Sequence, residues 1–145
     1  MANSEGLVDE EELLSELHKQ LIYWQKVLYL QDWTIGIKIC RQWEMSDTDT
    51  LAQCQWFLQR KDAIISVLSP HDLLGLKNRF LFGEEADYDI SLVHELLHLH
   101  FAPFQREGDE VSVEQAINGI SRGLVKVWKE QKESQPPSTP VGTYL

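Results

Sequence analysis

The segment from about residue 89 to residue 101 most constrains the fold, because it is apolar nearly all round and yet contains HELLH at residues 94–98. Pro103 ends the segment, so the pattern predicts a helix that is buried on more than one side. In a helix, residues four apart lie about 40° apart on one face. The imidazoles of His94 and His98 could therefore reach one metal ion.

Glu95 follows the first histidine and projects about 100° from it, so it can stand beside a metal ion without ligating it. A carboxylate in that position can take the proton of a zinc-activated water. The sequence therefore predicts Zn²⁺ bound by His94 and His98, with Glu95 as a catalytic general base. A metal would also supply partners for polar groups in an apolar helix. The alternative is a fold without metal, in which the histidines are hydrogen-bonded core residues.

A catalytic zinc site needs three protein ligands and a water, so a third ligand must come from elsewhere in the chain. No histidine follows His100, which projects away from His94 on the same helix and is expected to be a packed side chain or one that supports a ligand. A carboxylate of the last predicted helix is the most economical third ligand, from Glu110 or Glu114. Helical projection alone does not choose between them, although an acidic residue at Glu110 is also expected for capping.

Hydrophobic periodicity predicts an α+β fold. Apolar residues recur every three or four positions in the first and last helical segments and at every second position in the first two strands. Short turns between the strands favour a three-stranded, mainly antiparallel meander. The pattern predicts a first helix over about 9–30. Three strands follow: the first over about 33–43, the second through Cys54, Trp56 and Leu58, and the third over 63–68. A loop with a short helix or edge strand is expected over 70–89, then the buried helix over 89–101 and a last helix from near Asp109 to near Gln131.

The composition fits one domain, with 145 residues of which 43% are hydrophobic and 25% are charged. We predict a domain over residues 1–132 and a flexible, proline-rich tail over residues 133–145. Cys40 and Cys54 are too few for a disulfide framework and are expected to be ordinary strand residues.

The net charge of −10 repels phosphate backbones and anionic lipid, so nucleic-acid and membrane partners are disfavoured. No apolar stretch approaches the ~18 residues of a membrane span, and the first residues lack the basic and apolar regions of a signal peptide. We therefore expect a cytoplasmic protein that acts on a protein or peptide substrate. Its oligomeric state is left open.

HELLH followed by EQAIN at residues 114–118 resembles the gluzincin branch of the zinc metallopeptidases, in which a downstream helix supplies a glutamate ligand and an Asp or Asn one turn later. The order of elements is similar to that of the minimal single-domain gluzincins (minigluzincins) over most of residues 9–131. Repressor-cleaving peptidases of mobile genetic elements, with HExxH and a later Glu-x-x-Ala-Asn, are a close relative, although Ala116 falls one position early here.

This resemblance implies a zincin-like fold with an active-site helix and a glutamate helix. It makes Glu114 the third zinc ligand and Asn118 a residue that orients a histidine. The implied reaction is the hydrolysis of peptide bonds by a zinc metallopeptidase, in which Glu95 acts as general base. An extended substrate is expected to pair with an exposed edge strand between Trp33 and Leu68.

Other aspects of the function stay open at the level of sequence. Tyr88, His71 and Arg122 are unranked candidates for stabilising an oxyanion. Minimal gluzincins resemble latent enzymes closed by their C-terminal segments, so the tail could cover the site. A non-enzymatic alternative is a metal-stabilised interaction module, an inhibitor or adaptor that uses its acidic surface to bind a basic partner.

Overall fold

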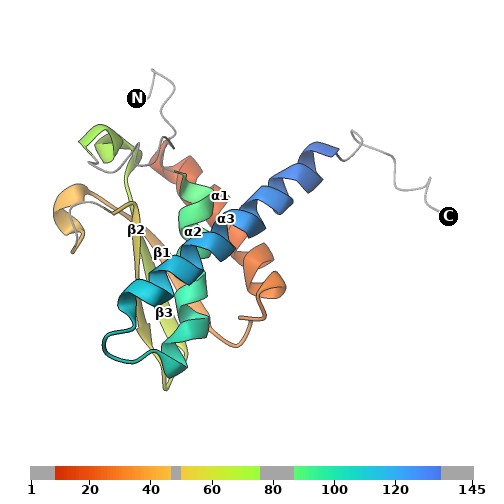
Figure 1. Cartoon of the computed structure of the whole chain (residues 1–145). Helices are drawn as coiled ribbons and strands as arrows, with labels where there is room; N and C mark the ends of the chain where they lie inside the picture. Colours follow the sequence, from red (N-terminus) through yellow and green to blue (C-terminus); the bar gives the residue numbers. More distant parts are fainter. Residues whose placement is uncertain (1–8, 47–49, 76–86, 135–145) are drawn as a thin grey trace.

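The computed structural model describes residues 9–46, 50–75 and 87–134. These residues form an α+β fold of three helices and a three-stranded sheet, as the periodicity predicts (Figure 1). The helices and strands are α1 (Glu10–Val27), β1 (Thr34–Cys40), β2 (Ala52–Phe57), β3 (Asp62–Leu68), α2 (Tyr88–Phe101) and α3 (Glu110–Ser134). The short 3-10 turns are η1 (Gln42–Glu44), η2 (Pro70–Gly75) and η4 (Ala102–Phe104).

The sheet is mixed, so the prediction of a mainly antiparallel meander is wrong. The strand order is β1-β3-β2, with β1 parallel to β3 and β2 antiparallel to it. Ile65 in the middle of β3 lies opposite Ile37 on one side and Cys54 on the other. Alternation shows which side chains share a face, but it carries no information about which strand is the neighbour. The most continuously apolar strand, β3, takes the central place because there it is buried most completely.

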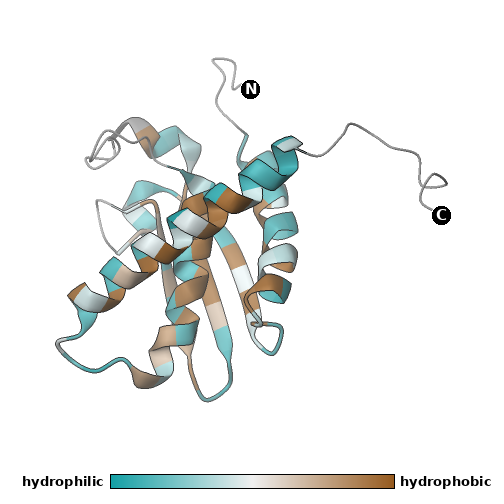
Figure 2. Cartoon of the chain, turned by 45° about the vertical axis from the view of Figure 1, so that its right-hand side comes forward, coloured by the Kyte–Doolittle hydropathy of each residue, from teal (hydrophilic) through white to brown (hydrophobic). Residues whose placement is uncertain are grey.

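Two helices lie on one face of the sheet, and the third lies on top of them. Helix α1 packs against β1, α2 packs against β2, and α3 crosses α2 on its outer side (Figure 1). Helix α2 is therefore covered on several sides, and Leu92, Val93 and Leu96 are fully buried. In Figure 2 the hydrophobic colour gathers on α2 and the strands, whereas the C-terminal part of α3 is hydrophilic. Among the described helices, none combines the length and apolar character needed to cross a membrane.

The start of α2 is fixed by groups from both other helices. Asp87 caps the helix by accepting hydrogen bonds from the backbone N–H groups of Asp89 and Ile90, at 2.8 and 3.1 Å. Lys129 of α3 donates to Asp87 at 3.1 Å, and Gln20 of α1 donates to Asp89 at 2.7 Å. These contacts set how α1 and α3 lie relative to α2.

The end of α2 leads into a tight return that places α3 over α2. Gly108 has φ +95°, a conformation that favours glycine, and its N–H donates to the Glu110 carboxylate at 3.1 Å. Helix α3 then runs to Ser134, so the expected domain boundary after residue 132 falls within its last turn. Most of the predicted tail, residues 135–145, lies outside the described residues, as do residues 76–86 of the predicted loop.

Candidate metal centre

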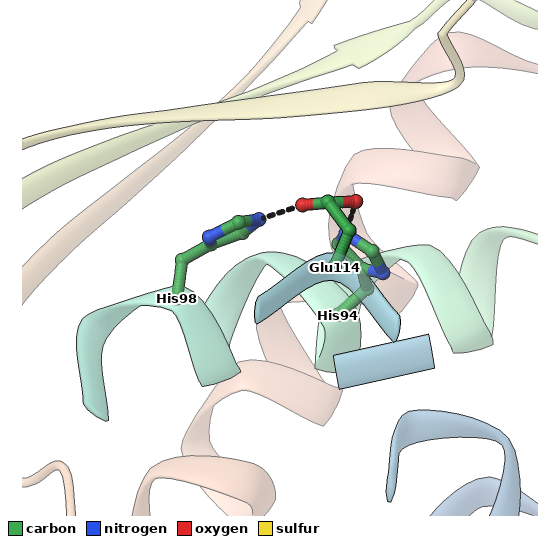
Figure 3. A group of neighbouring side chains, drawn as sticks. All are labelled: His94, His98 and Glu114. Carbon is green, nitrogen blue, oxygen red and sulfur yellow. Dashed lines mark ion pairs between the residues drawn. The ribbon is translucent and has the colours of Figure 1, made fainter. Parts of the chain in front are cut away.

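Three side chains meet where α3 crosses α2 (Figure 3). Nε2 of His94 lies 3.1 Å from Oε1 of Glu114, and Nε2 of His98 lies 2.9 Å from Oε2 of the same carboxylate. One nitrogen or oxygen of each side chain lies within 4.8 Å of the others. The histidine side chains are each 16% exposed and that of Glu114 is 47% exposed. The group is thus mostly buried on the α2 side and open to solvent on the α3 side.

The structure separates the two glutamates that spacing leaves equivalent. Glu110 lies in the first turn of α3, where its carboxylate accepts the N–H of Gly108 and caps the return. Glu114 lies one turn later, on the flank of the buried face formed by Val113 and Ile117, and reaches both histidines. The packing of that face against α2 sets the rotation of α3 about its axis. This rotation cannot be predicted from the spacing of residues within α3 alone.

The donor atoms suit zinc and other first-row divalent ions, which bind imidazole nitrogen and carboxylate oxygen. Both histidines present Nε2 to one carboxylate, with ring centroids 5.2 Å apart and ring planes at 63°. Without a metal, hydrogen bonds from His94 and, to a smaller extent, from His98 hold the pKa of Glu114 well below its usual range. The three residues therefore fit a metal ion, and the choice of zinc belongs to the proposal below.

Glu95 lies on α2 beside this group and is only 8% exposed. Its carboxyl group makes no hydrogen bond and no ion pair with the residues that the structure describes. Burial, with a further contribution from the charge of Glu114, raises the pKa of Glu95 to about 8. Burial and the charge of Glu95 likewise raise the pKa of the Cys54 thiol to about 12, and Cys54 lies on β2, the strand that packs against α2.

The metal-free protein is therefore expected to lose stability as the pH rises. An unfolded Glu95 titrates near its ordinary pKa of 4.5, whereas the folded one keeps its proton up to about pH 8. Between these values the folded state binds the extra proton, so the free energy of unfolding falls with rising pH by up to about 1.4 kcal/mol per pH unit. Urea unfolding of chelator-treated protein at several pH values from 5 to 8 measures this slope.

The Glu95→Gln variant serves as the control, because it cannot titrate and should show a flatter profile over the same range. Glu114 does not contribute there, since its lowered pKa affects stability only below about pH 4.5. Parallel profiles for the wild type and Glu95→Gln would contradict the assignment of the slope to Glu95.

Trp56 of β2 is a neighbour of the centre that the sequence pattern does not identify. Its ring stacks on that of His98, with centroids 5.9 Å apart and an angle of 19° between the planes. Alternation places Trp56 and Cys54 on one face of a strand, but only the fold shows that α2 covers that face. The only sequence signal for Trp56 is its position two residues after Cys54, which places both side chains on the same face of a strand.

The predicted role of Asn118 is not visible in the contacts of His98. Nδ1 of His98 is buried and has no hydrogen-bond partner among the described residues, so Asn118 makes no hydrogen bond to that nitrogen. Asn118 is exposed on α3, and its backbone carbonyl accepts the hydroxyl of Ser121 at 3.3 Å. A role of Asn118 toward His94 stays a prediction.

The other residues considered from sequence lie in separate places. Nε2 of His100 is 2.6 Å from the carbonyl oxygen of Leu28, which ties α2 to the segment after α1. The Tyr88 hydroxyl donates to the Leu68 carbonyl at 2.7 Å and is thus held by the backbone of β3. His71 in η2 and Arg122 on α3 are exposed. The stabilisation of an oxyanion by Tyr88, His71 or Arg122 stays a prediction.

Comparison with known proteins finds no matching family, no matching curated protein and no matching solved structure. The resemblance to the gluzincins therefore stays an expectation drawn from the motif and its spacing. The proposed function rests on the side chains of the candidate metal centre.

Proposed function

We propose that this chain is a zinc-dependent metallopeptidase in which His94, His98 and Glu114 hold the zinc ion and Glu95 is the general base. One observation carries the proposal: three metal-binding side chains from two helices converge beside a buried glutamate with no hydrogen-bond partner among the described residues. A structural ion pair would explain one histidine in contact with the Glu114 carboxylate. It does not explain two histidines on one carboxylate with a second, uncompensated carboxyl group next to them.

Each protein group has a separate task in this mechanism. When bound, a zinc ion would lower the pKa of a water ligand toward ~7 and polarise the scissile carbonyl. Its positive charge would also favour the ionised form of Glu95, against the burial and the charge of Glu114 that raise the pKa of this residue. Glu95 would accept a proton from the attacking water and pass it to the leaving amine. Its carboxyl group is available for this transfer because no described side chain forms a hydrogen bond or an ion pair with it.

The strand order narrows the place where an extended substrate could pair. Both sides of β3 are occupied by other strands, so β1 and β2 are the edges of the sheet that the described residues form. Strand β2 packs against α2 and places Trp56 on His98, whereas β1 packs against α1. We therefore infer that a peptide would add to the edge of β2 that no described strand pairs with, beside the histidines.

The test is the metal content and zinc-dependent turnover of the full-length protein. We expect about one zinc ion per purified chain by elemental analysis, and hydrolysis of a casein substrate that a chelator abolishes and added zinc restores. A protein that neither contains nor takes up zinc would contradict the proposal. Bound zinc without turnover would favour the non-catalytic, metal-stabilised interaction module.

A further inference from the structure

We propose that Trp56 is a positioning residue for His98, and that ring stacking replaces the hydrogen bond that usually fixes a metal-binding histidine. The inference rests on the proposed metal site, and it adds a residue that the motif does not contain. Its basis is the contact between two elements that are distant in sequence, the edge strand β2 and the helix α2.

A histidine that binds a metal through one ring nitrogen normally donates its other N–H to a carboxylate, a carbonyl or a water, which fixes the orientation of the ring. His98 departs from this pattern. Its Nε2 faces Glu114 at 2.9 Å, but its Nδ1 is buried and has no partner in the described part of the chain. Hydrogen bonds from the described residues therefore fix only one end of the imidazole.

The face of the imidazole is fixed instead by Trp56. The two ring planes are within 19° of parallel and their centroids are 5.9 Å apart, which is the geometry of an offset stack. Rotation of the His98 ring out of the metal-binding orientation would break this contact. The indole thus limits the rotation that a hydrogen bond on Nδ1 would otherwise prevent.

The indole is itself held in place. Trp56 pairs with Ala63 in the antiparallel register of β2 and β3, and its half-buried ring packs against the main hydrophobic core. A side chain on a paired strand and against the core is a stiffer support than one on a loop. Through the stack, the orientation of the His98 ring therefore depends on the position of the sheet.

The test compares Trp56→Leu and Trp56→Phe with the matched control Trp43→Leu. Trp43 is 75% exposed in η1 and does not belong to the centre, so its loss controls for removal of a tryptophan. Co²⁺ serves as the probe, because its affinity can be measured by competition with a chelator and its visible spectrum reports ligand geometry. We expect roughly 10–100-fold weaker Co²⁺ binding and an altered spectrum in Trp56→Leu. Trp56→Phe, which keeps a ring, should bind within about 3-fold of the wild type.

A second measurement needs no metal. The stacked indole of Trp56 should change the NMR chemical shifts of the His98 ring protons through its ring current. This contribution should be absent in Trp56→Leu and unchanged in Trp43→Leu. If Trp56→Leu fails to fold by circular dichroism, Trp56→Phe decides: affinity and spectrum close to the wild type support the inference, and the loss of both overturns it.

The outcomes separate this inference from the proposed function. Wild-type Co²⁺ affinity and spectrum in Trp56→Leu would overturn the role of Trp56 and leave the peptidase proposal intact. Weaker binding in Trp56→Leu, in a protein that binds Co²⁺ but hydrolyses no peptide, would support the role of Trp56 and reject the peptidase. A wild-type protein that binds no Co²⁺ would overturn both.

Discussion

Glu95→Gln is expected to lower kcat for peptide hydrolysis by roughly 10²–10⁴-fold, with the zinc content unchanged. Glutamine keeps the volume of the side chain but cannot accept a proton from water. Because Glu95 is not among the three converging ligand side chains, its loss should not release the metal. Turnover of a casein or peptide substrate and elemental analysis, performed on the same preparations, measure the two effects.

Glu110→Gln is the matched control for this variant, since Glu110 is an acidic residue at the start of α3 whose carboxylate contacts only the Gly108 N–H among the described residues. It should keep both zinc and turnover. Full activity in Glu95→Gln would reject Glu95 as the general base. Loss of zinc from Glu95→Gln would show instead that this carboxylate is a ligand.

Glu114→Gln is expected to weaken zinc binding by roughly 100-fold or more, beyond the effect typical of residues that only support ligands. The substitution removes the one carboxylate of the donor set and the acceptor that both histidines share. Competition titration with a chelator of known affinity measures the change in each variant.

The same titration on Glu110→Gln decides between the two glutamates that helical projection leaves open. We expect its zinc affinity to match that of the wild type, with only a small effect on stability from the lost cap. A larger loss of affinity in Glu110→Gln than in Glu114→Gln would show that the arrangement in Figure 3 is not the one that binds metal.

Much of the secondary structure could be predicted from the sequence, because it depends on local periodicity. The apolar pattern of residues 89–101 identifies α2 and its burial, and period-two alternation identifies β1 and β2 within a few residues. The strand order could not be predicted in this way. Pairing of β1 with β3 depends on which apolar strand can be covered on both faces, which is a property of the whole fold.

The candidate site shows the same division between local and tertiary information. His94 and His98 share a face because they are four residues apart on one helix, so the sequence is sufficient to pair them. The position of Glu114 depends on how α3 is rotated over α2, and that of Trp56 depends on which helix covers β2. Neither follows from a spacing within one element, although the family resemblance favours Glu114.

The strand order also bears on how the molecule folds. Strands β2 and β3 follow each other and pair through a short turn, whereas β1 pairs in parallel with a strand far along the chain, with Thr34 opposite Asp62. Closing that longer loop costs more chain entropy, so we expect the hairpin to form before the sheet is complete. All side chains of the proposed centre lie after residue 51, in the hairpin and the last two helices. The N-terminal helix and strand therefore complete the core around a site encoded in the remaining two thirds of the sequence.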